Sequence, residues 1–100
     1  MKIILADPVA EFIERLEKPT IAKVLRTLDL LEEFGADLGM PHSRAMGEGV
    51  FELRARGKQD IRLFYAFRGG AAHIVHGFMK KTPATPRHVL VLVKKRLDQI

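Results

Sequence analysis

The chain has 100 residues, no cysteine and a formal net charge of +5, which allow one compact domain spanning residues 1–100. The missing cysteines exclude disulfide bonds and thiolate metal sites, and they fit a reducing, cytoplasmic location. No apolar run reaches the length of a membrane span, and the N-terminus lacks a secretory signal pattern. We therefore expect a cytoplasmic protein with no membrane partner.

The first third of the sequence predicts a strand followed by a helical hairpin. Residues 2–6 form a short apolar run typical of a buried strand. Asp7 followed by Pro8 favours a helix start, because Asp is a good N-cap and proline is tolerated in the first turn. Pro19 ends this helix and starts a second one, for which Gly35 is a plausible stop. Both helices carry an apolar stripe at helical spacing, so we expect them to pack on a sheet.

The glycine-rich stretch 35–49 predicts a loop that carries His42, Ser43 and Arg44. His42 and Ser43 have neither an Asp partner at hydrolase spacing nor a nucleophile elbow, so they do not indicate a hydrolase. Arg44 is a candidate phosphate contact.

Three runs rich in β-branched and aromatic residues, 50–56, 61–67 and 72–81, follow with glycine-bearing turns between them. They predict a three-stranded antiparallel meander. Because successive side chains of a strand point to opposite faces, one face of the first two runs is apolar. Its residues are Phe51, Leu53, Ala55, Ile61, Leu63, Tyr65 and Phe67.

The opposite face of the predicted meander carries arginines. Its residues are Glu52, Arg54, Arg56, Arg62 and Phe64. No Asp or Glu occurs between Ile61 and Leu97, so we expect few counter-charges and a surface that binds an anion. Any one of these arginines alone is better explained as an ordinary solvent-facing residue. The cluster that favours function consists of Arg54, Arg62, Lys80 and Lys81.

The two halves of the chain differ in charge. Residues 1–48 carry six basic and nine acidic residues, a net charge of −3, whereas residues 49–100 carry eleven and three, a net charge of +8. An acidic half beside a basic half favours a polyanionic partner, most commonly nucleic acid.

The C-terminal segment predicts a helix. Thr85 and Pro86 are a plausible N-cap and first turn, and apolar residues then recur at helical spacing. The dense apolar run 89–93 is also compatible with a strand. The basic side chains near the end of this segment either stabilise the helix C-terminus or extend the basic surface. They are Lys94, Lys95 and Arg96.

Taken in order, these motifs resemble the RelE/HigB-type toxins of bacterial toxin–antitoxin systems, and most of all their phage-derived HigB-like branch. The residues that carry the resemblance are Gly39–His42, Phe51–Arg54, Ile61–Tyr65, Val75–Thr82, Pro86 and Arg96. The resemblance implies an α+β, RelE-like fold: a strand, a two-helix hairpin, a three-stranded antiparallel meander and a C-terminal helix.

The resemblance also implies a function. Such toxins are ribosome-dependent endoribonucleases that cut mRNA, and a small antitoxin, usually a helix-turn-helix DNA-binding protein, neutralises them. The expected partners are therefore an antitoxin, the ribosome and mRNA. The implied active-site cluster is Arg54, Arg62, Lys80 and Lys81. Some members carry a C-terminal tyrosine near the site, whereas this chain has only Tyr65, on the apolar face.

Metal-free RNA cleavage needs a base for the ribose 2′-hydroxyl, a cation for the developing phosphorane charge and an acid for the leaving 5′ oxygen. Arg54 and Arg62 suit the cationic role, because the guanidinium fork binds phosphate oxygens in pairs. Lys80, Lys81 and His76 are the candidates for proton transfer. His76 shares the predicted strand parity of Ile74 and Phe78, which favours a partly buried structural histidine. The dispersed histidines predict no metal site, and no cofactor is expected.

Further RNA contacts are expected around this cluster. The candidates are Arg44, Arg56, Phe64, Lys94, Lys95 and Arg96. Phe64 would stack on a base or meet the antitoxin. The alternative function is a non-catalytic binding toxin of the same fold, such as a ParE-like gyrase inhibitor, or a nucleic-acid-binding regulator.

Overall fold

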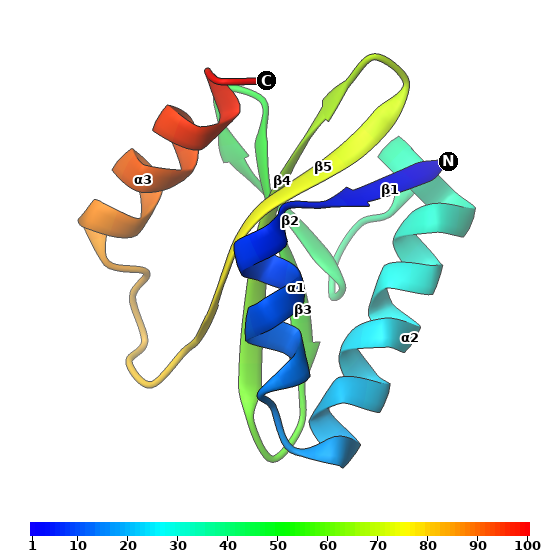
Figure 1. The fold of residues 1–100 in the computed structure, drawn as a ribbon, viewed down its shortest axis with the longest axis vertical. Coiled ribbons are helices and arrows are strands. Elements are labelled where there is room, and N and C mark those ends of the chain that lie inside the picture. The colour runs from blue at the N-terminus through cyan, green and yellow to red at the C-terminus, as the bar shows by residue number, and fades with distance from the viewer.

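A computed structural model describes residues 1–100 as one sheet with helices against both of its faces (Figure 1). In chain order the elements are β1 (Lys2–Leu5), α1 (Asp7–Glu14), α2 (Lys18–Phe34), the 3-10 turn η1 (Gly35–Asp37), β2 (Ser43–Gly47), β3 (Val50–Arg56), β4 (Asp60–Arg68), β5 (Ala71–Met79) and α3 (Arg87–Leu97). The predicted α+β class and the order of strand, two helices, meander and terminal helix are confirmed. None of the helices has the length and apolar character that a membrane span requires.

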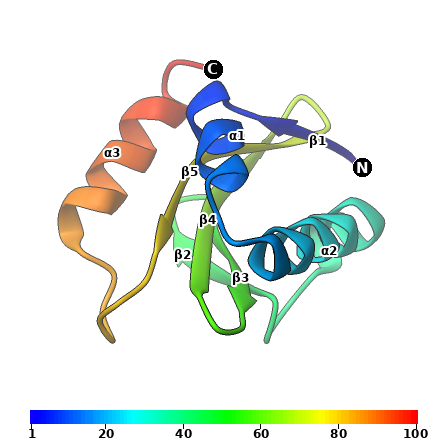
Figure 2. The same ribbon diagram turned by 60° about the horizontal axis from the view of Figure 1, so that its bottom comes forward.

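The sheet has five strands in the order β1-β5-β4-β3-β2. β1 lies parallel to β5, and every other neighbouring pair is antiparallel. The first strand of the chain therefore pairs with the last, and α1, α2 and the strands β2 to β4 lie between them in sequence (Figure 2).

Residues 35–49 are not only a loop, as the sequence predicted, because they contain η1 and the edge strand β2. Ser43 of β2 lies opposite Leu53 of β3, and the register shifts between Ala45 and Gly47. The stretch Ser43–Gly47 contains no β-branched or aromatic residue, so strand propensity gives no sign of it. Pairing with the edge of β3 makes this segment a strand.

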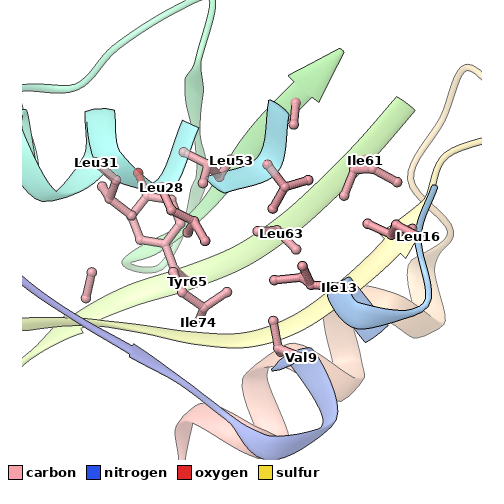
Figure 3. Close-up of a cluster of buried hydrophobic side chains, with 13 residues drawn as sticks. Val9, Ile13, Leu16, Leu28, Leu31, Leu53, Ile61, Leu63, Tyr65 and Ile74 are labelled. Atoms are coloured by element: carbon pink, nitrogen blue, oxygen red, sulfur yellow. The ribbon is translucent and has the colours of Figure 1, made fainter. Parts of the chain in front are cut away.

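The main core lies between one face of the sheet and the helices α1 and α2 (Figure 3). The predicted apolar face of the meander is confirmed, since Leu53, Leu63 and Tyr65 are all buried in this core. The Tyr65 hydroxyl lies 2.5 Å from the hydroxyl of Ser43. This hydrogen bond satisfies the one polar group that the tyrosine brings into the core.

The other face of the sheet is partly covered by α3, so the C-terminal run is a helix and not a strand. This second core consists of Val50, Phe64, Ala66, Val75, Val89, Val93 and Leu97. The expectation that this face is an anion-binding surface is therefore wrong for its centre, where Phe64 is 0% exposed.

The helix starts differ from the predicted caps. Asp7 is the first residue of α1 and Ala6 is its N-cap, without a side-chain cap. Pro86 is the N-cap of α3, and the hydroxyl of Thr85 instead donates a hydrogen bond to Glu52 Oε2 at 3.2 Å. The second helix does end at Gly35, as predicted, with a φ of 54° that suits glycine.

An irregularity in β5 reverses the side-chain parity that the sequence suggested. Phe64 pairs with His76 and Tyr65 pairs with Ile74, so Val75 is an extra residue, a β-bulge. As a result His76 stacks with Phe64 on the α3 side, whereas Ile74 belongs to the main core. The predicted grouping of Ile74 with His76 is wrong for this reason.

Gly77 follows the bulge and lies where α1 approaches β5. A Cβ at this position would lie 2.6 Å from Leu63 Cδ2 and 2.9 Å from Phe12 Cδ2. Real Cβ atoms do not approach carbon this closely, so a side chain here must displace the side chains of Leu63 and Phe12 from their packed positions. The close approach of helix and strand therefore requires glycine.

We predict that Gly77→Ala lowers the free energy of unfolding by about 1–3 kcal/mol, because it overpacks the core. Urea denaturation measures this change. Gly39→Ala is the matched control, since a Cβ there meets nothing within 4 Å and should alter stability by less than about 0.5 kcal/mol. Equal effects of the two substitutions would contradict the packing argument.

Candidate nucleic-acid interface

Arg54 and Arg62 lie opposite each other on β3 and β4, on the same face of the sheet as predicted. The Arg62 side chain is only 1% exposed and is bound on both edges of its guanidinium. Nε and Nη2 donate to the two carboxylate oxygens of Asp60 at 2.9 and 3.1 Å, and Nη1 donates to Glu52 Oε1 at 2.9 Å. Arg62 is therefore a fully paired arginine beneath the surface.

Glu52 connects the two arginines to the segment after β5. Its Oε1 accepts hydrogen bonds from Arg62 and from Arg54 Nε, the latter at 3.0 Å. Its Oε2 accepts the bond from Thr85. We call Glu52, Arg54, Asp60 and Arg62 the ion cluster. No buried side-chain nitrogen or oxygen of the protein lacks a hydrogen-bond partner, so the cluster is complete without a ligand.

The electrostatics of the ion cluster keep its members charged. Burial alone would raise the pKa of Glu52, but the hydrogen bonds and charges of Arg54 and Arg62 outweigh it and lower that pKa below its ordinary value. Hydrogen bonds from Arg62 lower the pKa of Asp60. Burial opposes the charge of Arg62, yet Asp60 and Glu52 together raise its pKa. A phosphate that took the place of these partners at Arg62 would have to displace two ionised carboxylates.

The expectation that the arginine face has few counter-charges is therefore wrong. Glu52 is a neighbour of Arg54 on the same strand face, and Asp60 lies one residue before the acid-free stretch that suggested an unpaired surface. The burial of Arg62 and its pairing with two carboxylates weigh against a direct phosphate contact in this arrangement. The full burial of Phe64 beneath α3 weighs likewise against stacking of an RNA base on its ring.

Cations without carboxylate partners gather next to the ion cluster. A pocket of about 480 Å³ has no apolar side chain apart from one proline, and we call it the lysine pocket. It is lined by Arg56, Asp60, Arg62, Lys80, Lys81, Thr82 and Pro83. The amide of Lys80 donates to the carbonyl of Asp60 at 2.7 Å, which fixes the lysine pair beside β4. Arg56 and Lys81 are exposed. Neither these two residues nor Lys80 forms an ion pair.

His76 is bound to α3 and not to the lysine pocket. Arg96 Nη1 donates to the carbonyl of Val75 at 2.8 Å and lies 3.1 Å from His76 Nδ1. Arginine only donates, so Nδ1 must accept and the proton of the neutral ring lies on Nε2. Burial lowers the pKa of His76, and the charges of Arg96 and His88 lower it further. These contacts favour a structural role for His76, the interpretation that the sequence also favoured.

The other predicted RNA contacts do not join the lysine pocket. Lys94 pairs with Glu48, Arg96 is used in the contact with β5, and Lys95 is exposed on the same helix. Figure 1 shows the C-terminal end of α3 at the opposite end of the sheet from the segment that follows β5. Arg44 is exposed on β2, opposite Glu52 in the register, and stays a candidate.

A second basic cavity was not predicted from the sequence. It has a volume of about 530 Å³, lies between α2 and β3, and has no acidic lining residue; we call it the α2 groove. Its charged and imidazole side chains are Lys23, Arg26, His42, Arg54 and Arg56. Lys23 and Arg26 lie three residues apart on one helix face. In the sequence this spacing looks the same as that of ordinary solvent-exposed residues, so it gave no sign of the groove.

Residues 11–98 match the family model of the phage-derived protein Gp49-like (DUF891). The chain belongs to the Gp49-like family. This family is associated with toxins of toxin–antitoxin systems. No curated protein matches the chain at a significant level.

The ion cluster of this Gp49-like protein predicts how the free energy of unfolding depends on pH. A carboxylate whose pKa is lowered by folding stabilises the protein above its ordinary pKa, and this contribution is lost as the pH falls through the lowered value. Glu52→Gln removes the anion between two arginines, so we expect it to lower the free energy of unfolding by about 3 kcal/mol near neutral pH. The wild-type protein should lose stability below the ordinary pKa of 4.5, and the variant should lose less.

Urea unfolding at a series of pH values measures both effects. Glu11→Gln, at an exposed position of α1, is the control and should follow the wild-type curve. If Glu52→Gln has wild-type stability at neutral pH, the carboxylate does not hold the cluster together.

Proposed function

We propose that this chain is the toxin of a toxin–antitoxin pair and that it cleaves mRNA on the ribosome as a metal-independent endoribonuclease of the RelE/HigB type. Its partner would be a small antitoxin of the helix-turn-helix class. The observation that carries the proposal is the lysine pocket, where Arg56, Lys80 and Lys81 surround a polar cavity without forming ion pairs. The association of the family with toxins supports it.

In the proposed reaction the ribose 2′ oxygen forms a bond to phosphorus while the bond from phosphorus to the 5′ oxygen breaks. The products are a 2′,3′-cyclic phosphate and a 5′-hydroxyl. Arg56, Lys80 and Lys81 neutralise the charge that develops on the non-bridging oxygens. The lysines are the candidates for moving the two protons, because the Nδ1 of His76 is taken by Arg96. Arg62 acts as a positioning residue that holds Asp60 and the end of β4 in place.

One set of observations favours the second candidate, a non-catalytic binding toxin. Arg54 and Arg62 are paired with carboxylates, and the predicted catalytic histidine, His76, is held by Arg96 of α3. A protein that only binds its target needs cations but no acid or base. Inhibition of gyrase, seen as loss of supercoiling, would favour this candidate, whereas new transcript ends favour the nuclease.

We expect Lys80→Ala/Lys81→Ala to remove transcript cleavage, lowering it more than about 100-fold because two charges next to the reacting phosphate are lost. The measurement is the mapping of transcript 5′ ends after induction of the wild-type and variant chains. Lys2→Ala/Lys18→Ala removes the same charge at exposed positions outside the pocket and should cleave like wild type. A wild-type chain that produces no new 5′ ends but relaxes DNA would sink the nuclease proposal.

A further inference from the structure

The α2 groove lies between α2 and the edge of β3 that extends past Ser43, the first residue of β2, where this edge has no neighbouring strand. The amide of Arg54 donates to the carbonyl of His42 at 2.8 Å, so this residue of β3 turns its backbone toward that edge. In an antiparallel strand the residue two positions on turns its amide to the same side. The amide of Arg56 therefore faces the edge beyond the end of β2, beside its own charged side chain.

Three cations of the groove have N–H groups without a strong hydrogen-bond acceptor in the protein. Arg54 is held by Glu52 through Nε, but the only partner of its Nη1 is the sulfur of Met40 at 3.9 Å, a weak acceptor. Lys23 and Arg26 are exposed and form no ion pair. The groove thus combines a fixed guanidinium with two free cations from α2.

The groove and the lysine pocket lie on either side of Arg56. This residue lines both cavities, at the end of the sheet that carries the β3–β4 turn. We call the surface from Lys23 past Arg56 to Lys81 the basic track. Only two of the residues that line the groove are apolar, Leu30 and Pro41. A protein segment would need apolar anchors there, whereas a nucleic-acid backbone needs only charge.

We propose that the α2 groove binds the phosphate backbone of single-stranded RNA and leads the strand into the lysine pocket. This inference rests on the proposed function, because it supplies the path of the RNA that the pocket would cut. Lys23, Arg26 and Arg54 contact successive phosphates on one side of Arg56, and Lys80 and Lys81 contact the scissile region on the other. Arg54 therefore keeps an RNA-binding role: its Nη1 is available to a phosphate, while its Nε donates to Glu52.

The test is binding of a short single-stranded 2′-O-methyl RNA, which has no 2′-hydroxyl and cannot be cleaved. Lys23→Ala/Arg26→Ala changes two exposed positions of α2 to a good helix former, so the fold should persist. The affinity should fall about 10-fold at low salt, and the slope of log K against log salt concentration should become shallower by about 1.4, the value for two lost phosphate contacts. Fluorescence anisotropy measures both quantities.

The control is Lys2→Ala/Arg15→Ala, which removes one lysine and one arginine at exposed positions outside the basic track. It should retain most of the wild-type affinity and slope. Equal losses in the two double variants would mean that only net charge matters and would overturn the proposal. So would a wild-type chain that fails to bind the RNA at low salt. A groove variant that binds RNA normally but loses affinity for polyglutamate would overturn it in favour of a protein partner.

Transcript mapping separates this inference from the proposed function. If the wild-type chain cleaves transcripts and the groove variant binds RNA normally, the groove proposal fails and the nuclease remains. If the groove variant loses RNA affinity and the wild-type chain cleaves nothing, the groove stands and the nuclease fails.

Discussion

The carboxylate of Glu52 is the interaction on which the charged face of this protein depends. It lies on the inner strand β3 with 1% exposure and binds Arg54 of the same strand, Arg62 of β4 and Thr85 of the segment before α3. Burying charges is costly, and the cost is offset only when each charge is paired and hydrogen-bonded. Here every member is satisfied, so the cluster fixes the positions of the neighbouring strands β3 and β4 relative to the more distant segment that carries Thr85.

This arrangement divides the cations into two groups with different roles. Arg62 is part of the scaffold, whereas Arg56, Lys80 and Lys81 lie around an open polar cavity without carboxylate partners. Arg62, which is paired with carboxylates, holds the edge of the cavity in place. The cations without carboxylate partners are available to bind an anionic ligand. The basic character of the second half of the chain thus belongs to the rim of the sheet and not to its centre.

The sequence predicted the core face because alternation in β3 and β4 is regular there, as Leu53, Leu63 and Tyr65 show. It failed where one residue changed the geometry: the extra Val75 in β5 moved His76 to the α3 side. The pairing of the arginines could have been anticipated, since alternation alone places Glu52 beside Arg54, and Asp60 lies two residues before Arg62. The α2 groove could not have been anticipated from the sequence. Its residues come from a helix and a strand edge that are brought together only in the folded protein.

Nuclear magnetic resonance of the arginine and lysine side chains during titration with non-cleavable RNA tests the central claim most directly. We predict that the Nε–H signal of Arg62, which is bonded to Asp60, stays unchanged while the signals of Lys80 and Lys81 shift with increasing RNA. A shift of the Arg62 signal at RNA concentrations that leave the two lysines unaffected would show that the buried arginine leaves its carboxylates for phosphate, and would contradict the account.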